Sequence, residues 1–95
     1  MRDWIRIHDV EFTPADARQR ARGVFGFVAL SMNGDVSAPG FKVLHLPSGR
    51  HELRFPTRQD RHGKHHAVLK PRGPAARVSI ERQVFAELRR QGVLP

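Results

Sequence analysis

The chain has 95 residues, a length at which we expect one domain with a core of modest size. It contains no cysteine, which excludes disulfides, thiolate catalysis and cysteine-based zinc sites, and we expect neither a signal peptide nor a membrane span. Seventeen Lys and Arg against nine Asp and Glu give a net charge of +8. The short, charged and alternating start of the chain predicts a folded cytoplasmic N-terminus. Fourteen of the seventeen basic residues are Arg, whose planar guanidinium matches phosphate, so the balance favours a nucleic-acid partner over an ordinary solvated surface.

The first half of the chain reads as three strands. Residues 1–12 alternate between apolar and polar side chains, which is typical of a strand with one polar face, and residues 14–19 read as a polar connector. Residues 22–32 are apolar on both faces, as in a central strand that is covered twice. The Asn-Gly pair at 33–34 predicts a tight hairpin turn into a third strand over 36–46, bent at its Pro-Gly pair.

The second half predicts two short strands and one helix. The strands are expected at 51–55 and 66–69, on either side of a loop at 60–64. A Gly-Pro pair opens a helix over residues 74–91, because proline suits the first helical turn, and apolar residues recur along it every three to four positions. The sequence therefore predicts a single α+β domain, residues 1–95, with a twisted antiparallel sheet of about five strands and one C-terminal amphipathic helix.

One helix can cover only one face of such a sheet. Strand alternation assigns Phe25 and Phe27 to the face opposite Val28, and that face needs a cover of its own. A second copy of the chain is the simplest cover, so we expect a homodimer with Phe25 and Phe27 in its interface.

Several short motifs occur in an order that resembles a known family. The chain carries the motifs IHDV (7–10), an NG turn, FKV (41–43), FPTR (55–58), a loop glycine at 63 and LKP (69–71), ahead of a final amphipathic helix. In order and spacing this resembles the stage V sporulation protein G (SpoVG) family of bacterial septation regulators, over most of the chain. The most specific element is the proline followed by a small hydroxyl residue and a basic one, Pro56-Thr57-Arg58.

The resemblance implies a small dimeric DNA-binding regulator of gene expression, septation, cell division or sporulation that is not an enzyme and needs no cofactor. Two alternatives stay open. An RNA-binding regulator would present the same phosphate contacts, because these do not distinguish the two polymers. A protein–protein adaptor in septation would direct the positive charge to an acidic partner or to an anionic membrane surface.

The basic residues cluster in the stretch RFPTRQDRHGKHHAVLKPR, residues 54–72, which carries six Lys or Arg. A loop and the passage into the helix hold most of them, and a helix start adds unpaired amides that suit a phosphate. The candidate phosphate contacts are Arg58, Arg61, Lys64, Lys70 and Arg72. The weaker candidates for contacts to bases are Arg77, where the chain passes into the helix, and Arg82 and Gln83, on the exposed face of the helix. A solvated surface is the alternative for both groups.

The chain has six histidines, and three of them, His62, His65 and His66, lie close in sequence. A strand would place His65 and His66 on opposite faces, and only Asp60 lies near enough to complete a metal site, so we expect no metal. A nuclease built on Asp60 and His62 has little support, and these histidines more simply add pH-dependent charge to the basic surface. Trp4 is assigned to packing, with base stacking as the alternative.

Overall fold

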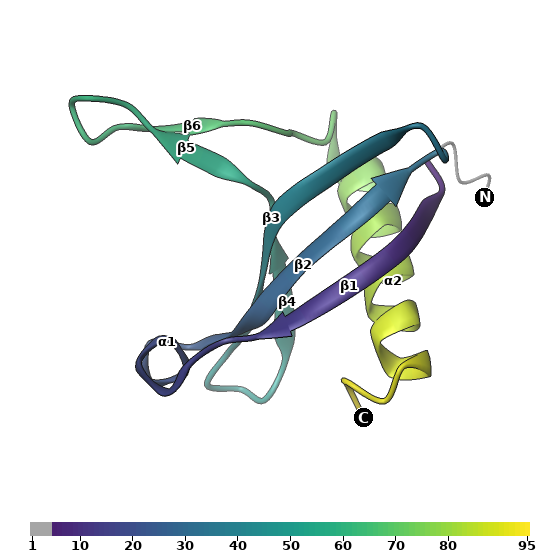
Figure 1. Ribbon diagram of the computed structural model, residues 1–95, viewed down its shortest axis with the longest axis horizontal. Coiled ribbons are helices and arrows are strands. Elements are labelled where there is room, and N and C mark those ends of the chain that lie inside the picture. Colours follow the sequence, from purple (N-terminus) through teal and green to yellow (C-terminus); the bar gives the residue numbers. More distant parts are fainter. Residues whose placement is uncertain (1–4) are drawn as a thin grey trace.

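A computed structural model describes residues 5–95 of the chain (Figure 1). Trp4, assigned to packing, lies outside the described residues. The elements, in chain order, are β1 (Ile7–Pro14), α1 (Ala17–Ala21), β2 (Val24–Met32), β3 (Val36–His45), β4 (His51–Arg54), β5 (Thr57–Gln59), β6 (His65–Ala67) and α2 (Pro74–Arg90).

The expected α+β architecture is confirmed. Strands β1 to β4 form one antiparallel sheet in sequence order, and α2 packs against one of its faces. The last strands differ from the prediction, because β5 and β6 form a separate two-stranded sheet rather than extending the first. The stretch read as a polar connector contains the short helix α1, whose start is closed by a capping box between Asp16 and Gln19.

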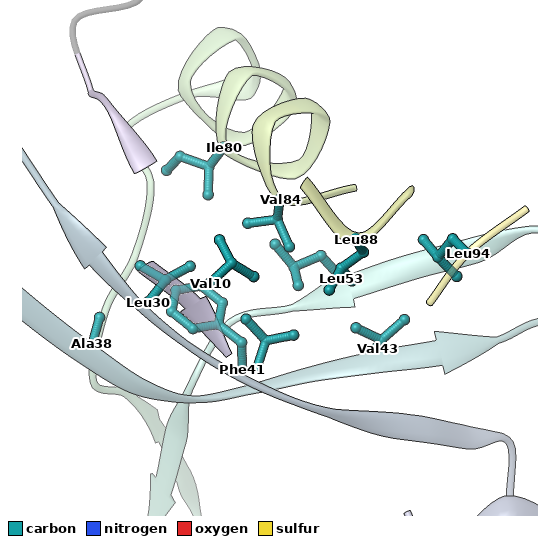
Figure 2. Packing of buried hydrophobic residues seen from close by; sticks show 11 residues of the cluster. Val10, Leu30, Ala38, Phe41, Val43, Leu53, Ile80, Val84, Leu88 and Leu94 are labelled. Atoms are coloured by element: carbon teal, nitrogen blue, oxygen red, sulfur yellow. The ribbon is translucent and has the colours of Figure 1, made fainter. Parts of the chain in front are cut away.

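The core lies between the four-stranded sheet and α2 (Figure 2). The apolar stripe of α2 buries Ile80, Val84 and Leu88, none of them more than 2% exposed. They pack against sheet residues that include Phe41 and Leu53, both fully buried. Continuous apolar contact of this kind is the main source of stability in a small domain. We call this the inner face of the sheet and the opposite one the outer face.

Two irregularities shape the central hairpin as the sequence predicts. Asn33 and Gly34 both take positive φ, 54° and 80°, and the turn joins the paired residues Met32 and Val36. Further along, two steps on β2 face three on β3, which places a β-bulge at Pro39-Gly40. The bulge bends β3 and lets Ala38 and Phe41 both reach the core.

Side chains of α2 and of its C-cap residue Gln91 bond to the backbone at both edges of the sheet. At the β1 edge, Gln83 accepts from the amide of Ile7 at 3.0 Å, and Gln91 donates to the carbonyl of Val10 at 2.9 Å. At the β4 edge, Glu81 accepts from the amide of Leu53 at 3.2 Å. Backbone groups of both edges are thus occupied where another strand would pair, and α2 is tied to the whole width of the sheet.

The hairpin of β5 and β6 reaches away from the rest of the molecule (Figure 1). Its strands pair in antiparallel register, with Thr57 opposite Ala67 and Gln59 opposite His65, and every residue of both strands is exposed. We call residues 57–67 the arm. It follows directly on β4 and returns to the start of α2, so its base adjoins the edge of the main sheet.

Candidate nucleic-acid interface

The tip of the arm is organised by one carboxylate. Asp60 accepts hydrogen bonds from the amides of His62, at 2.9 Å, and Lys64, at 3.0 Å, and its second oxygen lies 2.8 Å from Nε2 of His66. The bond to His66, followed by the Lys64 amide, lowers the pKa of Asp60 from its usual 3.8. Asp60 therefore holds a tight turn, with Gly63 at positive φ, that fixes the backbone positions of the neighbouring cations.

Three of the predicted phosphate contacts lie on the arm. Arg58 is in β5, opposite His66, while Arg61 and Lys64 flank the turn that Asp60 holds. All three side chains are exposed, and no ion pair joins them to an acid within residues 5–95. A polyanion would therefore meet them without first displacing a carboxylate partner.

Beyond the arm, the basic residues at the base differ from one another. Lys70 and Arg72 are exposed between β6 and α2, as predicted. Arg77, in the first turns of α2, is half-buried: it lies 3.5 Å from the carboxylate of Glu52, with its guanidinium 5.9 Å from the centre of the Phe55 ring. Arg77 thus fastens α2 to β4.

The assignment of Gln83 to the exposed helix face is wrong. Its side chain is half-buried, accepts from the Ile7 amide and donates to the Ile5 carbonyl at 2.7 Å and to Ser79 Oγ at 3.1 Å. Its amide is used inside the chain, because the position faces the β1 edge and not solvent. Arg82, one residue earlier, is exposed and lines a shallow hollow with Pro74 and Val78.

A row of side chains that the sequence did not predict crosses the outer face of the sheet. The pairings place Thr13 opposite Phe27, Phe27 opposite Lys42, and Lys42 opposite Arg54, so these four residues form one line from β1 to β4. We call it the outer row. Its four residues come from four separate segments of the sequence. Only the strand register, which cannot be read from the sequence, brings these residues together.

Between the outer face and the base of the arm lies an open hollow of about 440 Å³. Val24 and Leu44 contribute apolar lining, Lys42 and Arg54 add positive charge, and Thr57 and His65 contribute from the arm. Nε of Arg54 lies 3.1 Å from Glu52, yet the Arg54 side chain remains 59% exposed. Phe55 also lines the hollow, with its ring packed edge-on against Phe41, 5.1 Å between centroids.

Phe25 does not share the face of Phe27, and this part of the predicted interface is corrected. The pairing shifts between Val24 and Gly26, which leaves Phe25 as the extra residue of a bulge. Its ring packs against the core and lies 5.5 Å from the Phe12 ring and 5.1 Å from the imidazole of His51. Phe27 stays on the outer face, half-buried.

The histidines do not gather into a metal site in the described part of the chain, where no group of three His, Asp or Glu residues is placed to hold an ion. His62 is exposed and meets Asp60 through its backbone amide. His45 and His51 stack at the far end of the sheet, 4.9 Å between centroids.

No family model, curated protein or solved structure matches the chain. The resemblance to the SpoVG family therefore stays a prediction from the sequence. Within residues 5–95, none of the helices has the length and apolar character needed to span a membrane.

Proposed function

We propose that the protein is a small dimeric nucleic-acid-binding regulator of the SpoVG type, which binds DNA through the arm and acts on gene expression or cell division. The observation that carries the proposal is the arm itself: a hairpin that projects from the globule, holds no core residue, and presents Arg58, Arg61 and Lys64 around a tip fixed by Asp60. A fixed, projecting cationic element is suited to phosphates, whereas a merely solubilising charge needs no such scaffold.

The proposal includes no chemistry on the polymer. The one carboxylate at the arm tip, Asp60, is occupied by two backbone amides and a histidine, an arrangement that builds a turn. We expect labelled DNA or RNA to stay intact after incubation with the protein, with or without divalent ions. Metal-dependent cleavage that His62→Ala abolishes would contradict this part of the proposal.

A salt titration tests the proposal. Binding of the protein to a random-sequence duplex is measured against salt concentration, and the triple variant R58A/R61A/K64A is compared with R18A/R20A/R22A, which removes the same charge from the exposed arginines in and beside α1. Each lost phosphate contact should lower the slope of log affinity against log salt by roughly 0.9 on duplex DNA. We expect the arm variant to lose roughly 2 to 3 in slope and the control to lose much less.

The outcomes separate the candidate functions. An equal loss of salt slope in the two triple variants would mean that the total charge of the protein, not the arm, attracts the polymer. Unchanged affinity and slope in a folded R58A/R61A/K64A variant would refute the proposal, and capture of an acidic protein or of anionic vesicles in its place would favour the adaptor alternative. Stronger binding to RNA than to DNA of the same sequence would favour the post-transcriptional alternative.

A further inference from the structure

The outer face of the sheet is open where the arm leaves it. α2 covers the inner face, and α1 lies at one end of the sheet (Figure 1), so no helix of the described chain lies over the outer row. Phe27 is half-buried there and is not among the described residues that pack against the core. A half-buried aromatic ring in the middle of a sheet face, beside cations, is a surface that suits a ligand.

Charge is distributed unevenly along this face. The two cations of the outer row, Lys42 and Arg54, lie in β3 and β4, on the side from which the arm projects, and His65 of the arm lines the same hollow. Of the acids on this face, Glu52 already pairs with Arg54 and Arg77, and Glu11 lies in β1, the strand farthest from the arm. The side of the face next to the arm is therefore the one that attracts an anion.

A second copy of the chain fits this face less well than a polyanion does. A two-fold interface brings the same patch of both copies together, so Lys42 and Arg54 would approach the cations of their counterparts. The chain carries a net charge of +8, which adds to that repulsion. A polyanion, by contrast, gains from every one of these charges.

We propose that the outer row and the hollow beside the arm form a binding site for single-stranded nucleic acid. Lys42 and Arg54 contact the phosphates of the strand, and Phe27 supplies the ring on which a base stacks, as aromatic residues on open sheets do for unpaired bases. A duplex cannot use Phe27 in this way, because its bases are already stacked on one another and its outer surface presents phosphate and sugar. The arm, at one border of the site, adds its cations to the same strand.

This inference rests on the proposed function and deepens it, because it names the form of the polymer. It also gives the outer row a role distinct from that of the arm. The arm cations can contact phosphates of either polymer form, while Phe27 and the hollow select unpaired bases.

The test compares a labelled oligothymidine and an oligouridine strand of about 12 nucleotides, a length within the usual site sizes, with a duplex of equal length. Four variants are measured: K42A/R54A, F27L, the arm variant R58A/R61A/K64A and the charge-matched control R18A/R22A. We expect F27L to weaken binding to both single strands about 5- to 140-fold, the effect of losing one stacked base, and to leave duplex binding almost unchanged. K42A/R54A should lower the salt slope on single strands by roughly 0.7 for each cation, and R18A/R22A should not.

Thermal unfolding of each variant shows whether the fold is kept; if F27L unfolds, F27M and K42A/R54A carry the test. Parent-like single-strand affinity of the folded F27L and K42A/R54A variants, with binding lost in R58A/R61A/K64A, would overturn this inference and leave the proposed function intact. An equal loss of affinity for single strands and duplex in F27L would also overturn the inference. So would the conversion of a dimer to a monomer by F27L, because the outer face would then be an interface between copies. Parent-like binding in all variants, the arm variant included, would refute both.

Discussion

At Asp9 the backbone takes a positive φ of 51° and the pairing of β1 with β2 gains one extra residue. The sequence shows the reason: Ile7 occupies an odd position, while Val10 and Phe12 occupy even ones, so a regular strand would turn Val10 away from the core. The bulge restores the phase, and Val10 is only 6% exposed. The phase break was visible in the sequence, but the residue that absorbs it was not, because Asp is one of several residues that tolerate a left-handed conformation.

Replacing Asp9 tests this bulge. Asp9→Val should destabilise the fold by about 1–2 kcal/mol, because a β-branched residue is strained at positive φ. Asp9→Gly, which removes the strain, should change the free energy of unfolding by much less. Urea unfolding of the two variants measures the difference, and equal stability would show that position 9 carries no backbone strain.

Gly26 lies beneath the ring of Phe12, and a Cβ added there would collide with that ring and come within 2.8 Å of the Thr13 carbonyl. We expect Gly26→Ala to destabilise by about 1–3 kcal/mol, as overpacking does in a closed site. Phe12→Leu made in the same chain should recover part of this loss, although the phenylalanine has its own packing against Phe25. Chemical denaturation of the two single variants and the double variant gives the coupling, and strict additivity would contradict the close contact.

The stacked pair His45 and His51 makes stability depend on pH. Burial, and next the neighbouring His45 ring, lower the pKa of His51 from its usual 6.5. The folded state thus favours neutral His51, so its contribution is complete above pH 6.5 and is lost as the pH falls below that value. Unfolding measured between about pH 8 and 5 should show a steeper loss in the parent than in His51→Gln; parallel curves would contradict the coupling.

At the scale of elements, the sequence predicted most of the main sheet and α2, because their apolar periodicities are long and regular. It missed β5, which lies between the predicted strand at 51–55 and the predicted loop at 60–64, because three exposed residues bear no apolar pattern at all. The same weakness hid the arm as a unit: its order comes from the Asp60 turn and the β5–β6 ladder, not from burial. The cations of the arm were nonetheless found, since charge is read directly from composition, while the outer row required the register.

The local order of the arm should therefore depend on the side chain of Asp60 and not on core residues. Asp60→Ala removes acceptors for two amides and for His66, so we expect faster amide exchange across residues 57–67 with little change in global stability. In the parent the turn should be intact above the ordinary aspartate pKa of 3.8 and loosen as the pH falls through the lower folded value. Amide hydrogen exchange of the Asp60→Ala variant and of the parent, measured by NMR, tests this prediction. Equal protection of the arm amides in both proteins would show that Asp60 does not organise the tip.

At the scale of the molecule, α2 closes the inner face and bonds to both sheet edges, while the outer face, the arm and the solvent side of α2 remain open to a partner. The dimer expected from the sequence relied on two phenylalanines on one face, and only Phe27 is there. If the outer row binds a nucleic-acid strand, the second copy must dock elsewhere, and Phe27 must be dispensable for dimer formation.

Light scattering at micromolar concentration checks this arrangement. We expect about twice the chain mass of 10.8 kDa for both the parent and F27L. A monomeric parent would remove the dimer from the proposal, although the arm could still bind its target. A dimeric parent with a monomeric F27L variant would show that Phe27 lies in the dimer interface, as the sequence predicts.

The most direct test of nucleic-acid binding identifies the residues that contact the polymer. A titration of the ¹⁵N-labelled protein with a duplex and with a single strand, followed by amide chemical shifts, reports contacts residue by residue. We expect both polymers to shift residues 58–66, and the single strand alone to shift Phe27, Lys42 and Arg54 as well, with α1 unaffected. Shifts that spread over α1 and α2 but spare the arm, or no shifts at low salt, would contradict the account.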